Sequence, residues 1–344
     1  MSRVTIKDVA REAGVSASAV SRVFTEGGSA SSQTREKVMA AAERLGYRPS
    51  LLARGLVRNR TNLITLVTGR MNDPFDALFL DQFSESLAER GTHLLLASAG
   101  PSGEAGLLQA LDYQSDAVVV SAGTMSLEHS ELCVRAGLPI ILAGRVMAVP
   151  GVDCVLADNS DGGRQAAELL RRVGCRRLAY LGRGGATFSD GERWQGYKSA
   201  AAAAGLTVTN QIIEGRDDTA AAQGAAALLS RDLRPDGVFC SNDSIAIAAL
   251  ETARALGLKV PDELSIVGFN NIPTAARRSF RLTTLNYPVK RVVQGILALL
   301  DSRLDDPRRA DEVRRIPTQL VVRGTTRQHQ PEDWHALAET PALE

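Results

Sequence analysis

The chain has 344 residues, of which 44% are hydrophobic and 23% are charged, and these proportions are ordinary for a globular protein. This length accommodates a small module and a core of two lobes. No run reaches the roughly 18 consecutive apolar residues that span a bilayer, and the first residues lack the apolar stretch of a secretory signal. We therefore expect a cytoplasmic protein with no membrane partner.

The four cysteines do not have the spacing of a metal site. None forms a C-x-x-C pair, and the chain has only four histidines. We therefore expect free thiols in a reducing compartment, with no metal and no disulfide framework.

Charge is distributed unevenly along the chain. Residues 1–60 contain eleven Lys or Arg and five Asp or Glu, a net charge of +6, so the remainder carries −5 of the overall +1. A basic segment on a slightly acidic body is typical of a modular nucleic-acid-binding protein. We expect double-stranded DNA as the partner of this segment.

Residues 1–48 predict three short helices. Thr5 is a candidate N-cap, with an acidic residue three positions later as in a capping box. Ser16 can cap a second helix, Ala17–Phe24, after a turn of about three residues. A third helix begins near Ser31. This spacing is that of a helix-turn-helix.

The second helix presents short side chains and one arginine. Its outward face contains Ala17, Ser18, Ser21 and Arg22. Short side chains let the backbone approach a major groove, and an arginine can bind guanine O6 and N7. Ser16, Ser21 and backbone amides suit phosphates. The alternative is a three-helix adaptor that binds protein, which the local positive charge disfavours.

Residues 49–61, PSLLARGLVRNRT, have the composition of a DNA-dependent hinge. Pro49 blocks extension of the third helix, and Leu52, Ala53 and Leu56 would share one side of a one- to two-turn helix among arginines. A helix this short is marginal alone, so we expect it to order on DNA. Apolar wedges flanked by arginines kink minor grooves, although a plain basic linker is the alternative.

Three motifs, T-I-K-D-V-A-x-x-A-G-V-S-x-x-x-V-S-R-V, T-R-E-K-V-x-x-A-A-x-x-L-G-Y-x-P and L-A-x-x-L, span nearly all of residues 3–57. This segment resembles the DNA-binding head and hinge of lactose-repressor-type (LacI/GalR) regulators. The resemblance implies a homodimer on a pseudo-palindromic operator. It implies base contacts by Ala17, Ser18 and Arg22. It implies a minor-groove wedge at Leu56, supported by Tyr47, Ala53 and Arg54.

Residues 62–327 alternate apolar runs with helical segments. The predicted strands are Leu63–Thr68, His93–Ser98, Ala117–Ser121, Pro139–Ala143, Arg177–Gly182, Gly237–Cys240 and Leu264–Gly268. The predicted helices are Asp76–Arg90, Ser126–Ala136, Asn159–Val173, Glu192–Ala204, Thr219–Ser230, Ser244–Leu256 and Val289–Leu300. Such alternation predicts parallel sheets covered on both faces. Because the pattern restarts near Arg177, we predict two doubly wound lobes.

Polar side chains gather where the predicted strands end, which is where such sheets bind ligands. The candidate effector-binding residues are Asn72, Asp73, Phe75, Ser98, Ser121, Arg145, Asp158, Arg183, Arg193, Asn242 and Asn270. Arginines suit carboxylates, phosphates and vicinal hydroxyls, and an aromatic ring suits a sugar face. Structural alternatives remain open, because Asp158 can cap a helix, Arg183 can be solvated, Phe75 can be core and Asn270 can simply form a turn.

Further motifs, among them Y-L-G, R-W-Q-G-Y, V-F-C-S-N-D-S-I-A-I-A-A and L-V-V-R-G-T-T, resemble the effector-binding core of the same family, which is similar to periplasmic sugar-binding proteins. The resemblance implies an α/β core whose chain crosses three times between two lobes. The implied N-lobe is residues 62–158 plus 289–319, and the implied C-lobe is residues 159–287 plus 320–327.

The resemblance also implies that Arg193, in R-x-x-G-Y, holds the effector. The family usually has Asp where this chain has Asn270. Arg70, Arg145 and Arg183 are further cleft candidates, so the loss of that negative charge favours an anionic effector such as a sugar acid or sugar phosphate.

The sequence thus predicts a DNA-binding transcription regulator, a repressor whose operator affinity is controlled by a small metabolite between two lobes. Residues 328–344 lack leucine heptads, so we expect a flexible tail and a dimer. The absence of nucleotide-binding and zinc-protease motifs favours a protein with no cofactor and no enzymatic activity. The alternatives are a protein coregulator, a purine-type corepressor, or a non-regulatory sugar-binding protein.

Overall fold

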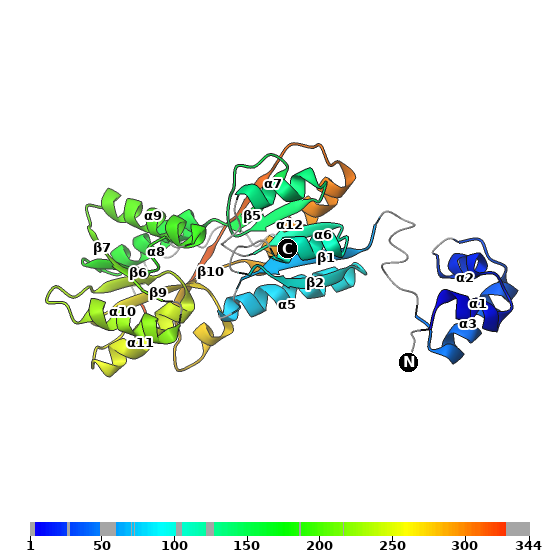
Figure 1. The fold of residues 1–344 in the computed structure, drawn as a ribbon. Coiled ribbons are helices and arrows are strands. Elements are labelled where there is room, and N and C mark those ends of the chain that lie inside the picture. Colours follow the sequence, from blue (N-terminus) through cyan, green and yellow to red (C-terminus); the bar gives the residue numbers. More distant parts are fainter. Residues whose placement is uncertain are drawn as a thin grey trace. The chain divides into compact units, whose positions relative to one another are not determined.

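The computed structural model describes residues 4–25, 28–48, 60–69, 71, 73–100, 105–121, 127–185, 187–215 and 217–327 (Figure 1). Most of the predicted hinge and all of the predicted tail lie outside the described residues. The chain divides into a small unit that contains the head and a large unit that contains most of the core.

The head consists of α1 (Ile6–Ala13), α2 (Ala17–Phe24) and α3 (Ser32–Leu45). The Thr5 N–H donates to the Asp8 carboxylate at 2.9 Å, as the predicted capping box requires. The Ser16 and Ser31 hydroxyls cap α2 and α3. One apolar core joins the helices through Val9, Ala10, Val20, Val23, Val38, Ala41 and Ala42. The predicted helix-turn-helix is therefore confirmed.

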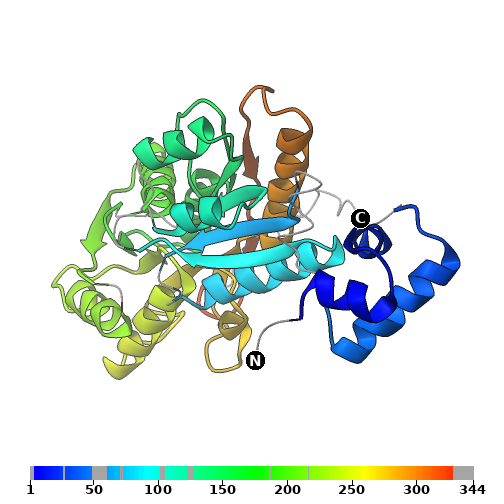
Figure 2. The same cartoon turned by 45° about the vertical axis from the view of Figure 1, so that its right-hand side comes forward.

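The first lobe contains a six-stranded sheet in the order β11-β5-β4-β3-β1-β2. Its strands are β1 (Leu63–Thr68), β2 (His93–Ser98), β3 (Ala117–Val120), β4 (Ile140–Ala143), β5 (Val152–Ala157) and β11 (Val313–Ile316). Its helices are α5 (Pro74–Glu89), α6 (Ala105–Asp112), α7 (Leu127–Arg135) and α12 (Val289–Asp305). Neighbouring strands from β11 through β1 pair in parallel. Figure 2 shows α5 (cyan) lying along β1 and β2.

The second lobe contains a six-stranded sheet in the order β12-β10-β9-β8-β6-β7. Its strands are β6 (Leu178–Gly182), β7 (Val208–Ile212), β8 (Gly237–Cys240), β9 (Ser265–Asn270), β10 (Thr283–Asn286) and β12 (Gln319–Val321). Its helices are α8 (Asn159–Arg172), α9 (Phe188–Ala203), α10 (Asp218–Leu229), α11 (Asp243–Ala255) and the 3₁₀ turn η1 (Pro273–Ala276).

The helices of the second lobe cover both faces of its sheet. Helix α8 packs on α9 and α10 on α11, and Figure 1 shows the two pairs on opposite sides of the strands. The strand pairings are parallel except that β12 runs antiparallel to β10. The prediction of two doubly wound parallel sheets is confirmed, apart from the antiparallel strand β12.

The chain passes between the two sheets three times. The passages lie between Ala157 and Asn159, between Asn286 and Val289, and between Ile316 and Gln319. The predicted third boundary, at 319/320, falls one residue after β12 begins.

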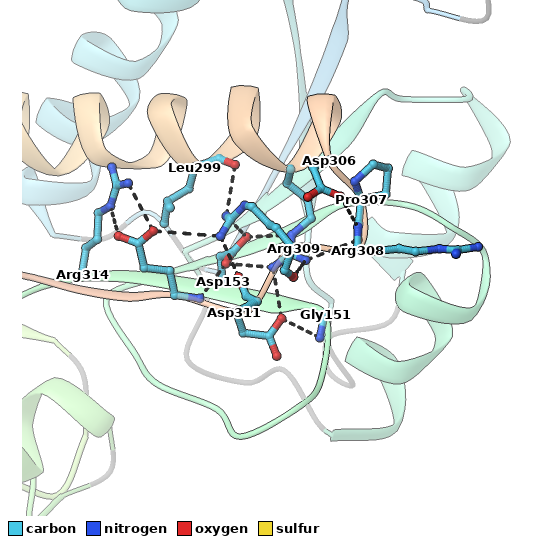
Figure 3. Close-up of polar contacts among 12 residues, drawn as sticks. Gly151, Asp153, Leu299, Asp306, Pro307, Arg308, Arg309, Asp311 and Arg314 are labelled. Atoms are coloured by element: carbon cyan, nitrogen blue, oxygen red, sulfur yellow. Dashed lines mark hydrogen bonds and ion pairs between the residues drawn. The ribbon is translucent and has the colours of Figure 1, made fainter.

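A buried carboxylate fastens the end of α12 to β5 (Figure 3). Asp153 is fully buried and accepts hydrogen bonds from Arg303 Nε at 3.1 Å, Arg303 Nη2 at 3.0 Å and Arg309 Nη2 at 2.7 Å. The backbone N–H of Glu312 donates to the same carboxylate at 2.9 Å. Because Glu312 directly precedes β11, this network also fixes the edge strand that leads to the third passage.

Candidate functional site

A cavity of about 220 Å³ lies between the two lobes of the core. It is bounded by residues that follow strands of both sheets, as expected for ligand sites of this architecture. Seven of the predicted effector-binding residues line it, namely Asp73, Phe75, Ser121, Arg145, Arg193, Asn242 and Asn270. The cavity is therefore where the candidate binding residues come together.

Arg193 brings a buried guanidinium to the cavity wall. Its Nε donates to Asn159 Oδ1 at 2.9 Å and its Nη1 donates to the Ser241 carbonyl at 2.6 Å. The guanidinium carbon lies 3.6 Å from the centre of the Phe269 ring. Burial lowers the pKa of Arg193, and among the described residues no carboxylate forms an ion pair with it. A cation held this way favours a ligand that supplies acceptor oxygens.

Two glycines allow α8 and α9 to bring Arg193 to this position. A Cβ on Gly163 would lie 2.2 Å from the Arg193 carbonyl oxygen, and a Cβ on Gly196 would lie 1.9 Å from the Ser160 carbonyl oxygen. The helices therefore touch backbone to backbone. Any larger side chain would push the first turns of α9 away from α8.

Asp73 and Asn242 connect the two sides of the cavity. Asn242 Nδ2 donates to Asp73 Oδ2 at 2.7 Å, and this hydrogen bond joins the segment after β1 to the segment after β8. Asp73 also caps α5 through the Phe75 N–H, and Asn242 caps α11 through the Ile245 N–H. Both side chains thus have structural partners as well as a place in the cavity wall.

Asn270 occupies a strained position at the end of β9. Its φ is +112°, and its side-chain Oδ1 is buried without a hydrogen-bond partner among the described residues. The turn that carries it is held by Asp243, which accepts from the Ile272 N–H at 2.8 Å and from the Thr284 hydroxyl at 2.5 Å. Burial raises the pKa of Asp243 to about 7. The unpartnered Asn270 oxygen can accept a hydrogen bond from a ligand hydroxyl.

Several lining residues were not predicted from the sequence. Burial, reinforced by Asp73, raises the pKa of the Asp76 carboxyl to about 6. Tyr287 meets Phe75 edge to face, with ring centres 4.7 Å apart. The Ser189 hydroxyl donates across the cavity to the Gly144 carbonyl at 2.9 Å. The only sequence signal for Asp76 was its position in the capping box of α5, which indicates a helix start rather than a site.

Three predicted residues are not among those that line the cavity. Asp158 caps α8 by accepting from the Asp161 N–H at 3.0 Å. Arg183 donates to the Gly215 carbonyl at 2.6 Å and is not part of the cavity lining. Ser98 accepts from the Gly100 N–H at 3.3 Å at the exposed end of β2. Asn72 and Arg70 lie outside the described residues.

The outward face of α2 presents polar side chains. Ser18, Ser21 and Arg22 are exposed, and Ala17 is half-buried against the head core. Ser16 Oγ lies 2.9 Å from Ser18 Oγ and accepts from the Ala19 N–H at 3.2 Å. The face is thus short, polar and accessible, with one arginine.

The other predicted DNA-binding residues have different surroundings. The Thr5 hydroxyl donates to Asp8 at 2.7 Å, and the Tyr47 ring packs 5.8 Å from the Phe24 ring inside the head. Ala53, Arg54 and Leu56 lie outside the described residues, so their predicted roles stay predictions.

Comparison with known proteins identifies the family. The DNA-binding model of the bacterial regulatory proteins of the lacI family matches residues 5–50, and the periplasmic binding protein-like domain matches residues 167–326. The transcriptional regulator DegA of Bacillus subtilis is 31% identical over 331 residues, which cover 94% of this chain and 98% of DegA. The chain belongs to the LacI family. The regulator CelR of Thermobifida fusca is 33% identical over 88% of this chain and 92% of CelR.

Solved structures of LacI-family regulators have the same fold. A CelR–cellobiose complex superposes with a TM-score of 0.67 at 28% identity, covering 94% of this chain and all of that one. A lac repressor dimer bound to operator superposes with a TM-score of 0.82 at 21% identity, over 94% and 99% of the two chains. The relatives are transcription regulators rather than enzymes. Within the described part of this chain, no helix is long and apolar enough to cross a membrane.

Proposed function

We propose that this LacI-family protein is a ligand-controlled transcriptional repressor. It binds operator DNA through α2 and the segment after Tyr47, and a small metabolite in the interlobe cavity changes its affinity for DNA. The observation that carries the proposal is the buried Arg193, which has no acidic partner among the described residues and faces a cavity lined by both lobes. A ligand touching both lobes stabilises one lobe arrangement over another, which is how an effector shifts a two-state regulator.

The lining charges favour a neutral polyhydroxy effector over the anion predicted from the sequence. Arg145 and Arg193 line the cavity, but Asp73 and Asp76 line it too. Two carboxylates therefore offset two guanidiniums. A wall that combines polar donors and acceptors with apolar side chains suits sugar hydroxyls and ring faces. The cavity of about 220 Å³ lies below the roughly 300–1,000 Å³ of drug-sized sites and favours a small sugar. The cellobiose complex of CelR supports the same class.

A thermal-shift panel tests the effector class. It includes neutral mono- and disaccharides, sugar acids, sugar phosphates and purines at equal concentrations, because a ligand of the folded state raises the midpoint by mass action. We expect neutral sugars to raise the midpoint and Arg193→Lys to abolish the shift. A response confined to acids or phosphates would restore the anion hypothesis, and a response to purines alone would favour a purine corepressor.

DNA reading is tested with a duplex selected by the protein from a random pool. Arg22→Ala should weaken binding to that duplex by about fivefold to 150-fold, because one bidentate arginine contact contributes about 1–3 kcal/mol of discrimination. The thermal midpoint should stay unchanged, since Arg22 is exposed. Equal affinity of the variant and the wild type would remove Arg22 from the reading surface.

The proposal includes assembly and location. We propose a homodimer that places two heads on a two-fold related operator, as the lac repressor dimer does on its operator. We also propose a cytoplasmic protein with no catalytic activity, because a regulator must reach DNA and the cavity serves for binding. Sedimentation of the protein with and without the selected duplex tests the dimer.

A further inference from the structure

An ion pair connects the two lobes through Glu192, the residue that precedes Arg193. Glu192 precedes Arg193 on α9 in the second lobe, and Arg315 is on β11 in the first. Arg315 Nη2 donates to Glu192 Oε1 at 2.7 Å and Arg315 Nη1 donates to Glu192 Oε2 at 3.1 Å. This two-pronged geometry fixes the orientation of both groups more firmly than a single contact does. The hydrogen bond to Glu192 also raises the pKa of Arg315.

Asn159 connects this ion pair to the guanidinium of Arg193. Its Nδ2 lies 3.4 Å from Glu192 Oε2 and 3.1 Å from the Ala157 carbonyl, so both protons of the amide face acceptors. Its Oδ1 is then left to accept from Arg193 Nε at 2.9 Å. Asn159 is fully buried. The carboxylate of Glu192 thus helps to decide which atom Asn159 offers to Arg193.

The hydrogen-bonded groups that link Arg193 to Arg315 lie next to two of the three passages of the chain between the lobes. Asn159 begins α8 immediately after the first passage, and Arg315 is the penultimate residue of β11, just before the third. A change in the angle between the lobes is expected to alter the distance from Arg315 to Glu192, because Arg315 is on β11 of the first lobe and Glu192 is on α9 of the second. Contiguous hydrogen-bonded groups of this kind can couple a binding group to a conformational change.

We propose that Glu192 and Arg315 form a cross-lobe clamp that positions Arg193 through Asn159, so that the lobe angle and the effector-facing guanidinium change together. The inference rests on the proposed function in taking the cavity as the effector site. Arg315 and Glu192 touch no ligand in this scheme. They are positioning residues whose loss leaves the cavity lined as before but frees Asn159 and Arg193 to reorient.

Hydrogen–deuterium exchange of the full-length protein tests the clamp without any effector or DNA. We expect Glu192→Arg and Arg315→Glu each to speed exchange in the first turns of α8 and α9 by about twofold to fivefold, the range for loss of a partly exposed pair. The double variant, which restores an ion pair with reversed polarity, should return exchange close to the wild-type rate. Arg315→Lys, which keeps the charge but loses the second prong, should fall between.

Two further measurements separate positioning from general damage. Trp194 adjoins Arg193, and its ring lies 5.3 Å from the Tyr180 ring. In a Trp334→Phe background Trp194 is the sole tryptophan. Its acrylamide quenching should rise in each single variant and recover in the double. Glu131→Arg, which breaks the exposed Arg135–Glu131 pair of α7 in the first lobe, is the control and should leave both signals unchanged.

The result that overturns the clamp is unambiguous. Single variants that exchange at the wild-type rate, or a double variant that remains as perturbed as the singles, would show that the pair does not hold Arg193. If a charge reversal prevents folding, Arg315→Gln gives the same comparison with a milder change. None of these outcomes depends on the thermal-shift panel, so the clamp and the proposed effector site can fail separately.

Discussion

Replacing Asp153 by alanine should destabilise the core more than any surface ion-pair substitution. The carboxylate accepts three arginine N–H groups and the Glu312 backbone N–H in a fully buried position (Figure 3). Removing one partner of a buried ion pair costs about 3–5 kcal/mol, because the remaining charge keeps its desolvation penalty. Arg303 retains Asp311 at 3.0 Å and the Arg309 carbonyl at 2.8 Å. We therefore expect Asp153→Ala to lower the free energy of unfolding by about 3 kcal/mol, the lower end of that range.

Urea unfolding followed by circular dichroism measures this change. With a slope of about 3 kcal/mol per molar urea, the midpoint should fall by about 1 M. Asp301→Ala is the control, because the Arg90–Asp301 pair at 2.8 Å is largely exposed and should contribute about 0–1 kcal/mol. Equal midpoint shifts for the two variants would refute the reasoning that burial, rather than pairing alone, makes Asp153 important.

Two other substitutions test the framework of the cavity. Gly196→Ala places a Cβ 1.9 Å from the Ser160 carbonyl and should lower the free energy of unfolding by about 1–3 kcal/mol, whereas Gly191→Ala on the same helix meets only an ordinary contact at 3.8 Å and should be neutral or stabilising. Thermal midpoints of the two variants check this, and equal effects would contradict it. The raised pKa of Asp243, about 7 against an ordinary 3.8, means that the folded protein holds this proton more tightly. The stability that Asp243 contributes should therefore be fully present below about pH 3.8 and be lost as the pH rises toward about 7. Asp243→Asn should flatten this part of the pH dependence in urea titrations, and an unchanged slope would assign it to other groups.

Local signals in the sequence were enough to place the elements of the head. The caps at Thr5, Ser16 and Ser31 depend only on residues two or three positions away, so the predicted helix starts agree with the structure to within a residue or so. Three central strands, β3, β4 and β8, were also predicted, because they are short apolar runs that are buried along their whole length.

The edges of the sheets were harder to predict. The interior strands β5 and β10 did not appear among the predicted strands, although they are almost wholly buried. Strands β7, β11 and β12 did not appear either, and each has exposed positions and polar or charged side chains. All three stand at the outer end of a sheet. An edge strand buries few of its residues, so it lacks the continuous apolar run by which a central parallel strand is recognised.

The sequence predicted correctly that the cavity lies where the strands of both sheets end, but it did not predict which side chains at those ends line it. Asp158 and Asp73 both follow a first-lobe strand and both cap a helix, yet only Asp73 lines the cavity. Arg183 and Arg193 carry the same charge ten residues apart. Arg193 lines the cavity, and the close approach of α9 to α8 at Gly196 helps to place it there. Arg183 instead donates to the Gly215 carbonyl within the second lobe. The decisive contacts join residues distant in sequence, and a single sequence read locally contains no signal for them.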